Sequence, residues 1–124
     1  MHVAYLYSGD DGESHFGALD LPLHAEPSGA SVTEFFAAEG VQFRFGRVQT
    51  LDFHPAPRRQ FLLFLSGQQE YAVADGTRQA FGPGDYLLVD DTEGHGHISH
   101  RTTAGLSVWV SVPKSLDLSR WRTA

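Results

Sequence analysis

Cysteine is absent from the 124 residues of the chain. Disulfide bonds and thiolate metal sites are therefore excluded, and this absence fits a reducing compartment. Basic residues are also few, since 9 Lys and Arg stand against 15 Asp and Glu and give a formal net charge of −6. Such a chain has no positive field that would attract phosphate backbones, so we expect no nucleic-acid partner.

Long apolar runs are missing as well. No stretch approaches the ~20 residues that a membrane helix needs. The first residues, MHVAYLYSGDDGESH, lack the basic start and apolar middle of a signal peptide. We therefore expect a cytoplasmic protein without a membrane partner. A length of 124 residues corresponds to about one domain, and a domain of this size can bury a core without cross-links.

Helical periodicity is scarce. Short segments rich in Val, Phe, Leu and Tyr recur between Gly, Pro and Asp, a spacing typical of an all-β domain. Alternation within each segment predicts which side chains face the core. In VQFRF (residues 41–45) it puts the valine and both phenylalanines on one half-buried face. In GLSVWVSV (residues 105–112) it turns the leucine and the three valines inward.

Turn sequences separate these segments. Asp75-Gly76 predicts a tight hairpin, because this dipeptide readily adopts left-handed dihedrals, and GPGD at 82–85 predicts a second turn. Only SVTEFFAAEG (31–40) has helical character, with Ser31 or Thr33 as a possible cap. We expect roughly eight to ten strands, more than one open sheet holds comfortably, and hence a closed or double-sheet barrel.

Histidine is the commonest metal ligand and titrates nearest neutrality, so each histidine is informative. His95 and His97 lie two positions apart and would share a face of a regular strand, with only Gly96 between them. The other interpretation is a pair of solvent-facing imidazoles beside a turn. His100 falls on the opposite face. His2 and His24 are expected to have surface or packing roles.

His54 precedes PAPRRQ, where Pro55 and Pro57 stiffen the backbone and prevent regular ladder hydrogen bonds. This rigidity suits a fixed ligand and equally a plain strand end. Arg58 and Arg59 follow, and because adjacent strand residues face opposite ways, one of them is expected to point into a cavity. An inward guanidinium favours a carboxylate or enolate ligand.

These residues resemble the first motif of the cupins, small β-barrel proteins that include bacterial isomerases, dioxygenases and decarboxylases. That motif holds two histidines, a glutamate and a glycine in order. His54 matches the first histidine and Gly67 the glycine. Ala56 and Gln60 replace the second histidine and the glutamate, so two of the three usual metal ligands of the motif are changed.

The second cupin motif runs from a glycine through Pro-x-Gly to a histidine. Gly84 begins the match and His95 ends it, with Asp90 and Thr92 in place of the proline and the glycine. A loop two residues longer makes His97 the ligand instead. The segments HPAPRRQ and DDTEGHGH also resemble those of short, uncharacterised bacterial single-domain cupins, and this likeness favours His97.

The resemblance implies an all-β fold, a double-stranded β-helix (jelly-roll) cupin barrel. It implies a single cupin domain over residues 1–124, with its core at about 41–113, an N-terminal strand and loop at 1–40 and a tail at 114–124. It also implies a divalent metal held by His54, Gln60 and one or both of His95 and His97. His54 and His97 are the candidate catalytic residues.

All four of these side chains are neutral, so metal affinity should be weak unless an anionic substrate supplies the missing charge. Histidine-rich coordination suits Fe, Zn, Ni or Cu better than Mg or Ca. The replacements at Ala56 and Gln60 leave open the alternative that the metal is lost and that only a ligand pocket remains.

We expect the rest of this pocket to consist of aromatic faces and one guanidinium, from Phe43, Phe64, Tyr86 and Arg58. A small organic acid would bind there. It would be the substrate of a metal-dependent dioxygenase, isomerase or decarboxylase, or the ligand of a sensory cupin without catalysis. The apolar segment at 105–112, with Trp109 in a subunit interface, predicts a homodimer.

Overall fold

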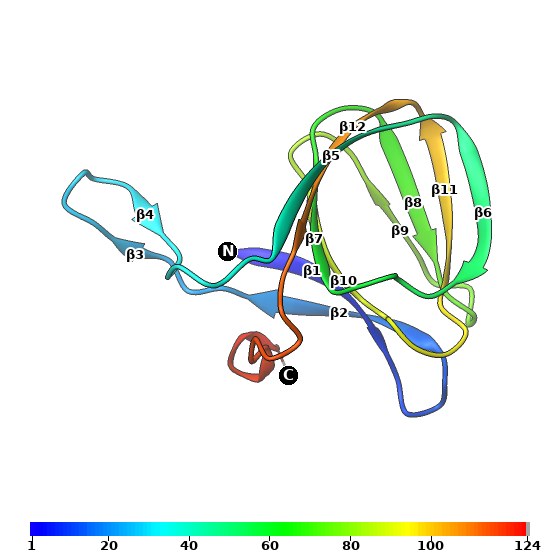
Figure 1. Ribbon diagram of the computed structural model, residues 1–124, viewed down its shortest axis with the longest axis horizontal. Coiled ribbons are helices and arrows are strands. Elements are labelled where there is room, and N and C mark those ends of the chain that lie inside the picture. Colours follow the sequence, from blue (N-terminus) through cyan, green and yellow to red (C-terminus); the bar gives the residue numbers. More distant parts are fainter. Residues whose placement is uncertain (124) are drawn as a thin grey trace.

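The computed structural model describes residues 1–123, and strands dominate it (Figure 1). One sheet has six strands: β1 (His2–Ser8), β2 (Ser14–Asp20), β5 (Gly40–Gly46), β7 (Gln60–Phe64), β10 (Tyr86–Asp90) and β12 (Gly105–Ser111). Their order is β2-β1-β10-β7-β12-β5. β1 and β10 run parallel, and the other neighbouring strands are antiparallel.

The second sheet is antiparallel and has four strands: β6 (Gln49–His54), β8 (Gln68–Ala72), β9 (Arg78–Phe81) and β11 (His97–Thr103). Their order is β6-β11-β8-β9. Two short strands, β3 (His24–Ala25) and β4 (Ser31–Val32), form a hairpin that projects away from both sheets (Figure 1). The prediction of an all-β fold is confirmed, and the structure shows that its main sheets are one mixed and one antiparallel sheet.

Both predicted turns are present. β8 and β9 pair across Asp75-Gly76, with Ala72 opposite Arg78, and Gly76 has a φ of +91°. Gly84, with a φ of +89°, forms the turn before β10. These glycines adopt a left-handed conformation that other residues rarely tolerate.

The helical character predicted for residues 31–40 is wrong. Ser31–Val32 pairs as β4, and residues 33–39 form no helix. Phe36 packs against the core, whereas Phe35 is fully exposed. A ten-residue segment with one anchoring side chain has no apolar stripe, and a short helix without such a stripe is not stable.

The inner core lies between the two sheets. It consists of Leu6, Ala56, Leu62, Phe64, Tyr71, Val73, Phe81, Leu87 and Val89. These side chains come from both sheets, so this cluster holds the sheets together. Full burial of one large apolar side chain contributes ~1.5–3 kcal/mol.

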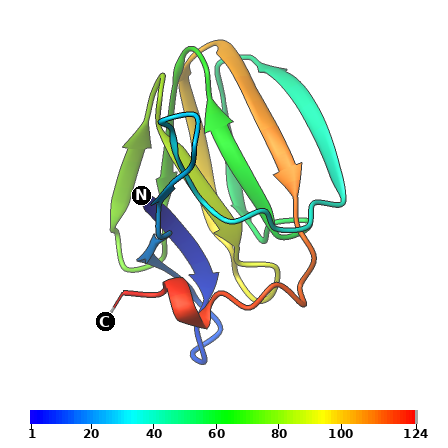
Figure 2. The same ribbon diagram turned by 90° about the vertical axis from the view of Figure 1, so that its left-hand side faces the viewer.

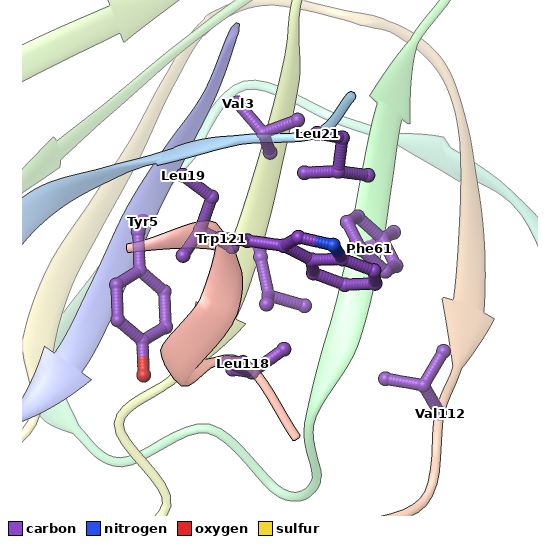
Figure 3. Close-up of a cluster of buried hydrophobic side chains, with 9 residues drawn as sticks. Val3, Tyr5, Leu19, Leu21, Phe61, Val112, Leu118 and Trp121 are labelled. Atoms are coloured by element: carbon purple, nitrogen blue, oxygen red, sulfur yellow. The ribbon is translucent and has the colours of Figure 1, made fainter. Parts of the chain in front are cut away.

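An outer core covers part of the other face of the six-stranded sheet. There the C-terminal segment, which contains the 3-10 helix η1 (Ser119–Trp121), packs Trp121 and Leu118 against Val3, Tyr5 and Phe61 (Figure 3). Figure 2 shows this segment beside the N-terminal strand. Within residues 1–123 no helix is both long and apolar enough to cross a lipid bilayer.

On β5 and β12 the side chains face the opposite way from the prediction. Phe43 and Phe45 are 76% and 71% exposed, whereas Arg44 between them lines the space between the sheets. On β12 Leu106 is exposed and Ser107 is buried. The period of two is as predicted, but the inward assignment is wrong, because the inner face of these two strands borders an open cavity and not a packed core.

Candidate functional site

A cavity of about 790 Å³ opens between the two sheets. One wall comes from β6, β11 and β8, whose register arranges the lining residues in rows. The rows are Gln49, Arg101 and Gln69; then Leu51, Ser99 and Tyr71; then His54 and His97. This wall therefore runs from a cationic end to an imidazole end.

His97 is held by a buried carboxylate. Its Nδ1 lies 2.5 Å from Oδ2 of Asp91, and the two side chains are 4% and 0% exposed. Ser14 donates its hydroxyl to the same oxygen at 2.6 Å. A carboxylate in this position keeps the proton on Nδ1, so the neutral ring presents Nε2 to the cavity as an acceptor.

Asp91 carries a second feature of interest. Its other oxygen, Oδ1, is buried and has no hydrogen-bond partner among residues 1–123. Buried polar atoms are usually satisfied, and exceptions are concentrated where function or an ordered water requires them. Both side-chain hydrogen bonds of Asp91, to His97 and to Ser14, are therefore made through Oδ2.

His54 is oriented in a similar way. Its Nδ1 lies 2.7 Å from the main-chain oxygen of Asp52. Because a carbonyl can only accept, Nδ1 carries the proton and Nε2 of the neutral ring is an acceptor. The ring centroids of His54 and His97 lie 4.6 Å apart, and those of Tyr71 and His97 lie 5.3 Å apart in an edge-on arrangement. Two oriented imidazoles thus meet at one end of the cavity.

Gly96 permits this close approach. It has a φ of +82°, and a Cβ at this position would lie 2.1 Å from the carbonyl carbon of His54. A residue with a side chain would therefore push the backbone of His54 away. The glycine at this position is what brings the two histidine-bearing segments together.

The same glycine separates His95 from His97. β11 begins only at His97, because the left-handed Gly96 interrupts the extended chain. The ring of His95 stacks on Phe53 at 3.9 Å, and its Nδ1 lies 2.8 Å from a carboxylate oxygen of Glu13, outside the cavity lining. The shared face expected for the two histidines does not form.

The other predicted pocket residues lie elsewhere. Phe64 packs on Phe81 in the inner core, and Tyr86 contacts the outer core. Phe43 is exposed on the outer face, and Arg58 lines a shallower hollow that Gln60 also borders. Among the predicted site residues, the structure brings together His54, His97 and Gln60.

The donor set does not complete a metal centre. Among residues 1–123 no three His, Cys, Asp or Glu side chains are placed to hold a metal ion. His54 and His97 supply two imidazoles, Gln60 adds an amide, and the buried Ala56 offers no donor. Imidazole suits Fe, Zn, Ni and Cu. The lining contains no Asp or Glu that would balance a dication.

The end of the cavity opposite the two imidazoles carries arginines that were not predicted from the sequence. Arg44, Arg47 and Arg101 all line the cavity, and the guanidinium of Arg44 stacks over Trp109 at 3.9 Å. Burial raises the pKa of Tyr71, and the charges of Arg101 and Arg44 oppose this shift. The phenol therefore stays protonated near neutral pH and can donate a hydrogen bond.

Arg101 was within reach of sequence reasoning, since it follows His97 by four residues and alternation puts both on one face. No spacing pattern in the sequence marks Tyr71 or Asp91 as site residues, because their place in the site depends on burial in the folded chain.

Protein-family models give no match to the chain, and no curated protein is similar to it. Among solved structures, the crystal structure of protein NMB1881 from Neisseria meningitidis is similar with a TM-score of 0.47 and 17% sequence identity. The similarity covers 66% of this chain and 89% of that one. Neither a family nor an activity follows from a likeness at this level.

Proposed function

We propose that the chain is a small cupin-type protein, with a jelly-roll barrel, that binds a small organic acid in its cavity. One observation carries this proposal: two imidazoles, each oriented through Nδ1, face one end of a cavity whose lining holds arginines and no carboxylate. An anionic ligand supplies the countercharge that the lining lacks.

Proton transfer is the chemistry that the residues present support best. Nε2 of His97 takes a proton from a carbon beside a carbonyl group of the ligand, and the bonding electrons form an enol or enolate. Asp91 keeps the ring in the required tautomer and stabilises the imidazolium, as in other carboxylate–histidine pairs. Return of a proton from His97 to the same carbon exchanges that hydrogen with solvent. In a ligand whose carbon–carbon double bond is conjugated with the enolate, delivery of the proton to the far carbon of that system, from His97 or from the adjacent His54, shifts the double bond and completes an isomerisation.

Deuterium exchange tests this activity. The probes are pyruvate, 2-oxobutyrate and 5-oxohexanoate, incubated in D2O and followed by proton NMR. We expect the protein to accelerate exchange beside the keto group of at least one probe, and His97→Gln to remove the acceleration. Tight binding without exchange would favour the second class, a sensory cupin without catalysis. No binding of any acid would contradict the proposal.

A metal-dependent reaction of the dioxygenase, isomerase or decarboxylase type is the other candidate. Its support is that histidine ligands of metals usually donate Nδ1–H to a carboxylate or a carbonyl, as His97 and His54 do here. With only two imidazoles and Gln60, this candidate requires the organic acid to provide the anionic donor. Metal content of protein purified without a histidine tag, with and without 5-oxohexanoate, tests it. Metal near zero in both samples after reconstitution would exclude it.

A further inference from the structure

We infer that the cavity binds a two-ended acid, whose carboxylate is held by Arg101 and Arg44 and lies remote from the group held by His54 and His97. The inference rests on the proposed function and names its substrate class. That class is an acid with an apolar body and an oxo or hydroxyl group several bonds away from the carboxylate.

Arg101 is a buried cation without an anion. The residue is 6% exposed, and its Nη1 donates to the main-chain oxygen of Thr103 at 3.2 Å. None of the carboxylates in residues 1–123 pairs with it, whereas Arg59, Arg78 and Arg120 each have an acidic partner. Among residues 1–123 no nitrogen of this guanidinium is both fully buried and unpaired, so its remaining N–H groups reach the cavity and are available to a ligand.

The position of this guanidinium is fixed by two glycines. A Cβ at Gly46 would lie 2.6 Å from Nε of Arg101, and a Cβ at Gly67 would lie 2.8 Å from its Nη1. The backbone of both residues therefore packs directly against the side chain. Arg101 is held in place in the way that a binding group must be, unlike a mobile surface arginine.

Arg44 reaches the same region from the opposite sheet. It stacks over Trp109 and lies two positions before Gly46 on β5, and the backbone of Gly46 packs against Arg101. Arg47 adds a third guanidinium to the lining. In a chain of net charge −6, a cavity with three arginines and no acidic side chain is selective for an anion.

The distance between the two ends follows from β11. His97, Ser99 and Arg101 alternate along this strand and all line the cavity. Four residues of a strand span about 13 Å. The lining between the ends is largely apolar and includes Leu51, Leu62, Val89 and Trp109. An acid whose carboxylate adjoins its reacting group cannot contact both ends, whereas a longer one can.

A binding experiment tests this assignment with 5-oxohexanoate, its uncharged amide 5-oxohexanamide, and acetate, measured by calorimetry and thermal shift. We expect the acid to bind the wild-type protein at least tenfold more tightly than the amide and acetate. Arg101→Gln should remove this preference. Arg78→Gln, which changes an exposed arginine paired with Glu70, should keep it. If Arg101→Gln fails to fold, Arg44→Gln takes its place in the test. This substitution changes an exposed side chain and should weaken the preference for the acid.

Several results would overturn the inference: equal binding of acid and amide, undiminished binding of the acid by Arg101→Gln, or no binding of any probe. A different set of results would show that the proposed function is wrong while this inference holds. In that case the charge preference depends on Arg101 as expected, while His97→Gln changes neither binding nor deuterium exchange.

A second inference concerns the outer face of the six-stranded sheet. Six apolar side chains there are more than a third exposed: Val41, Phe43, Phe45, Leu63, Leu65 and Leu106. Val108, which pairs with both Phe43 and Leu63, lies in the middle of this patch. Trp121 and Leu118 cover the neighbouring part of the same sheet face, around Phe61. The part over β5, β12 and β7 has no such cover in residues 1–123.

We propose that a second copy of the chain covers this patch. The patch carries no charge, which is typical of interfaces between identical subunits. A net charge of −6 disfavours an anionic membrane surface as the occupant. An exposed phenylalanine can bury ~150–250 Å². Two of them with four aliphatic side chains approach the ~800 Å² that each partner of a stable dimer buries.

Sedimentation at micromolar concentration tests the dimer. We expect a dimer for the wild-type chain and a monomer for Phe43→Glu. Val48→Ser changes an exposed apolar residue outside the patch and should remain a dimer. Circular dichroism checks that each variant is folded. A wild-type monomer, or a folded Phe43→Glu dimer, would overturn this second inference.

Discussion

Asp91 holds His97 by a contact of 2.5 Å between Oδ2 and Nδ1, at a position where the carboxylate has no exposure to solvent. A hydrogen bond to a buried charged group contributes about 1.5–3 kcal/mol. We therefore expect Asp91→Asn to lower the free energy of unfolding by about 2 kcal/mol and to mix the tautomers of His97, as measured by denaturation and by nitrogen-15 NMR of the ring.

Ser14→Ala provides the matched control, because it removes the other hydrogen bond to the same oxygen and leaves the ring contact intact. We expect a smaller loss of stability and an unchanged tautomer. If Asp91→Asn left the tautomer of His97 unchanged, the orienting role of Asp91 would be wrong.

Gly96→Ala should disrupt the imidazole pair. The left-handed φ alone costs roughly 1–2 kcal/mol for a residue with a side chain. The added Cβ would also lie 2.1 Å from the backbone of His54. We expect a total loss of at least about 3 kcal/mol in the free energy of unfolding, together with loss of acid binding.

Gly76→Ala separates the two effects, since Gly76 has a φ of +91° but no atom within 4 Å of the place that an added Cβ would take. It should show the backbone strain alone and keep acid binding. Equal losses for the two variants would contradict the close approach of Gly96 to His54.

Alkaline pH should destabilise the fold through buried tyrosines. Burial and the neighbouring Asp90, whose Oδ2 accepts a hydrogen bond of 3.0 Å from the hydroxyl, raise the pKa of Tyr5 to about 12. Because the unfolded chain releases this proton near pH 10, the stabilisation is complete below about pH 10 and is lost as the pH rises toward about 12. Burial raises the pKa of Tyr71 as well.

The measurement is the urea midpoint of unfolding between about pH 9 and pH 11, on either side of the ordinary tyrosine pKa. We expect a decrease with rising pH that is smaller in Tyr5→Phe and smaller again in Tyr5→Phe with Tyr71→Phe. A midpoint that changes equally in all three proteins would assign the effect to other groups.

Gln60→Glu should create the anionic donor that the imidazole end lacks. The residue lines the cavity and is 7% exposed, so a carboxylate there would act on a metal beside His54 and His97 with little screening. We expect at least a tenfold rise in zinc affinity by calorimetry. Adding Ala56→His should raise it further, although Ala56 is in the inner core and overpacking will lower stability.

Gln69→Glu is the matched control, because Gln69 lines the same cavity in the row of Arg101 and not in the row of the histidines. It should leave zinc affinity unchanged. An equal rise in both variants would mean that zinc binds without the imidazole pair.

Sequence reasoning reached the class of fold because turns such as Asp75-Gly76 fix the local chain and need no tertiary contact. It failed for the facing of β5 and β12, since alternation states which residues share a face but not which face is inside. Phe43 and Arg44 exchanged their expected places because the interior there is a cavity that arginine lines. The prediction that His95 shares a face with His97 was wrong for a related reason, because the left-handed φ of Gly96 ends the regular alternation.

About half of the candidate site could be predicted from the sequence. His54, His97 and Gln60 followed from spacing and from the resemblance, and they do meet in the cavity. Asp91 could not be distinguished from Asp90 in the sequence, although one is buried against His97 and the other binds Arg59. Packing of the whole chain decides that difference.

The most direct test of the central claim is nitrogen-15 NMR of the histidine rings during titration with 5-oxohexanoate. If an organic acid occupies the cavity beside the imidazole pair, the ring signals of His54 and His97 will shift in a saturable way, and those of the exposed His2 and His24 will not. Signals of His54 and His97 that stay constant while the acid binds would show that the ligand lies elsewhere, and the proposed site would be wrong.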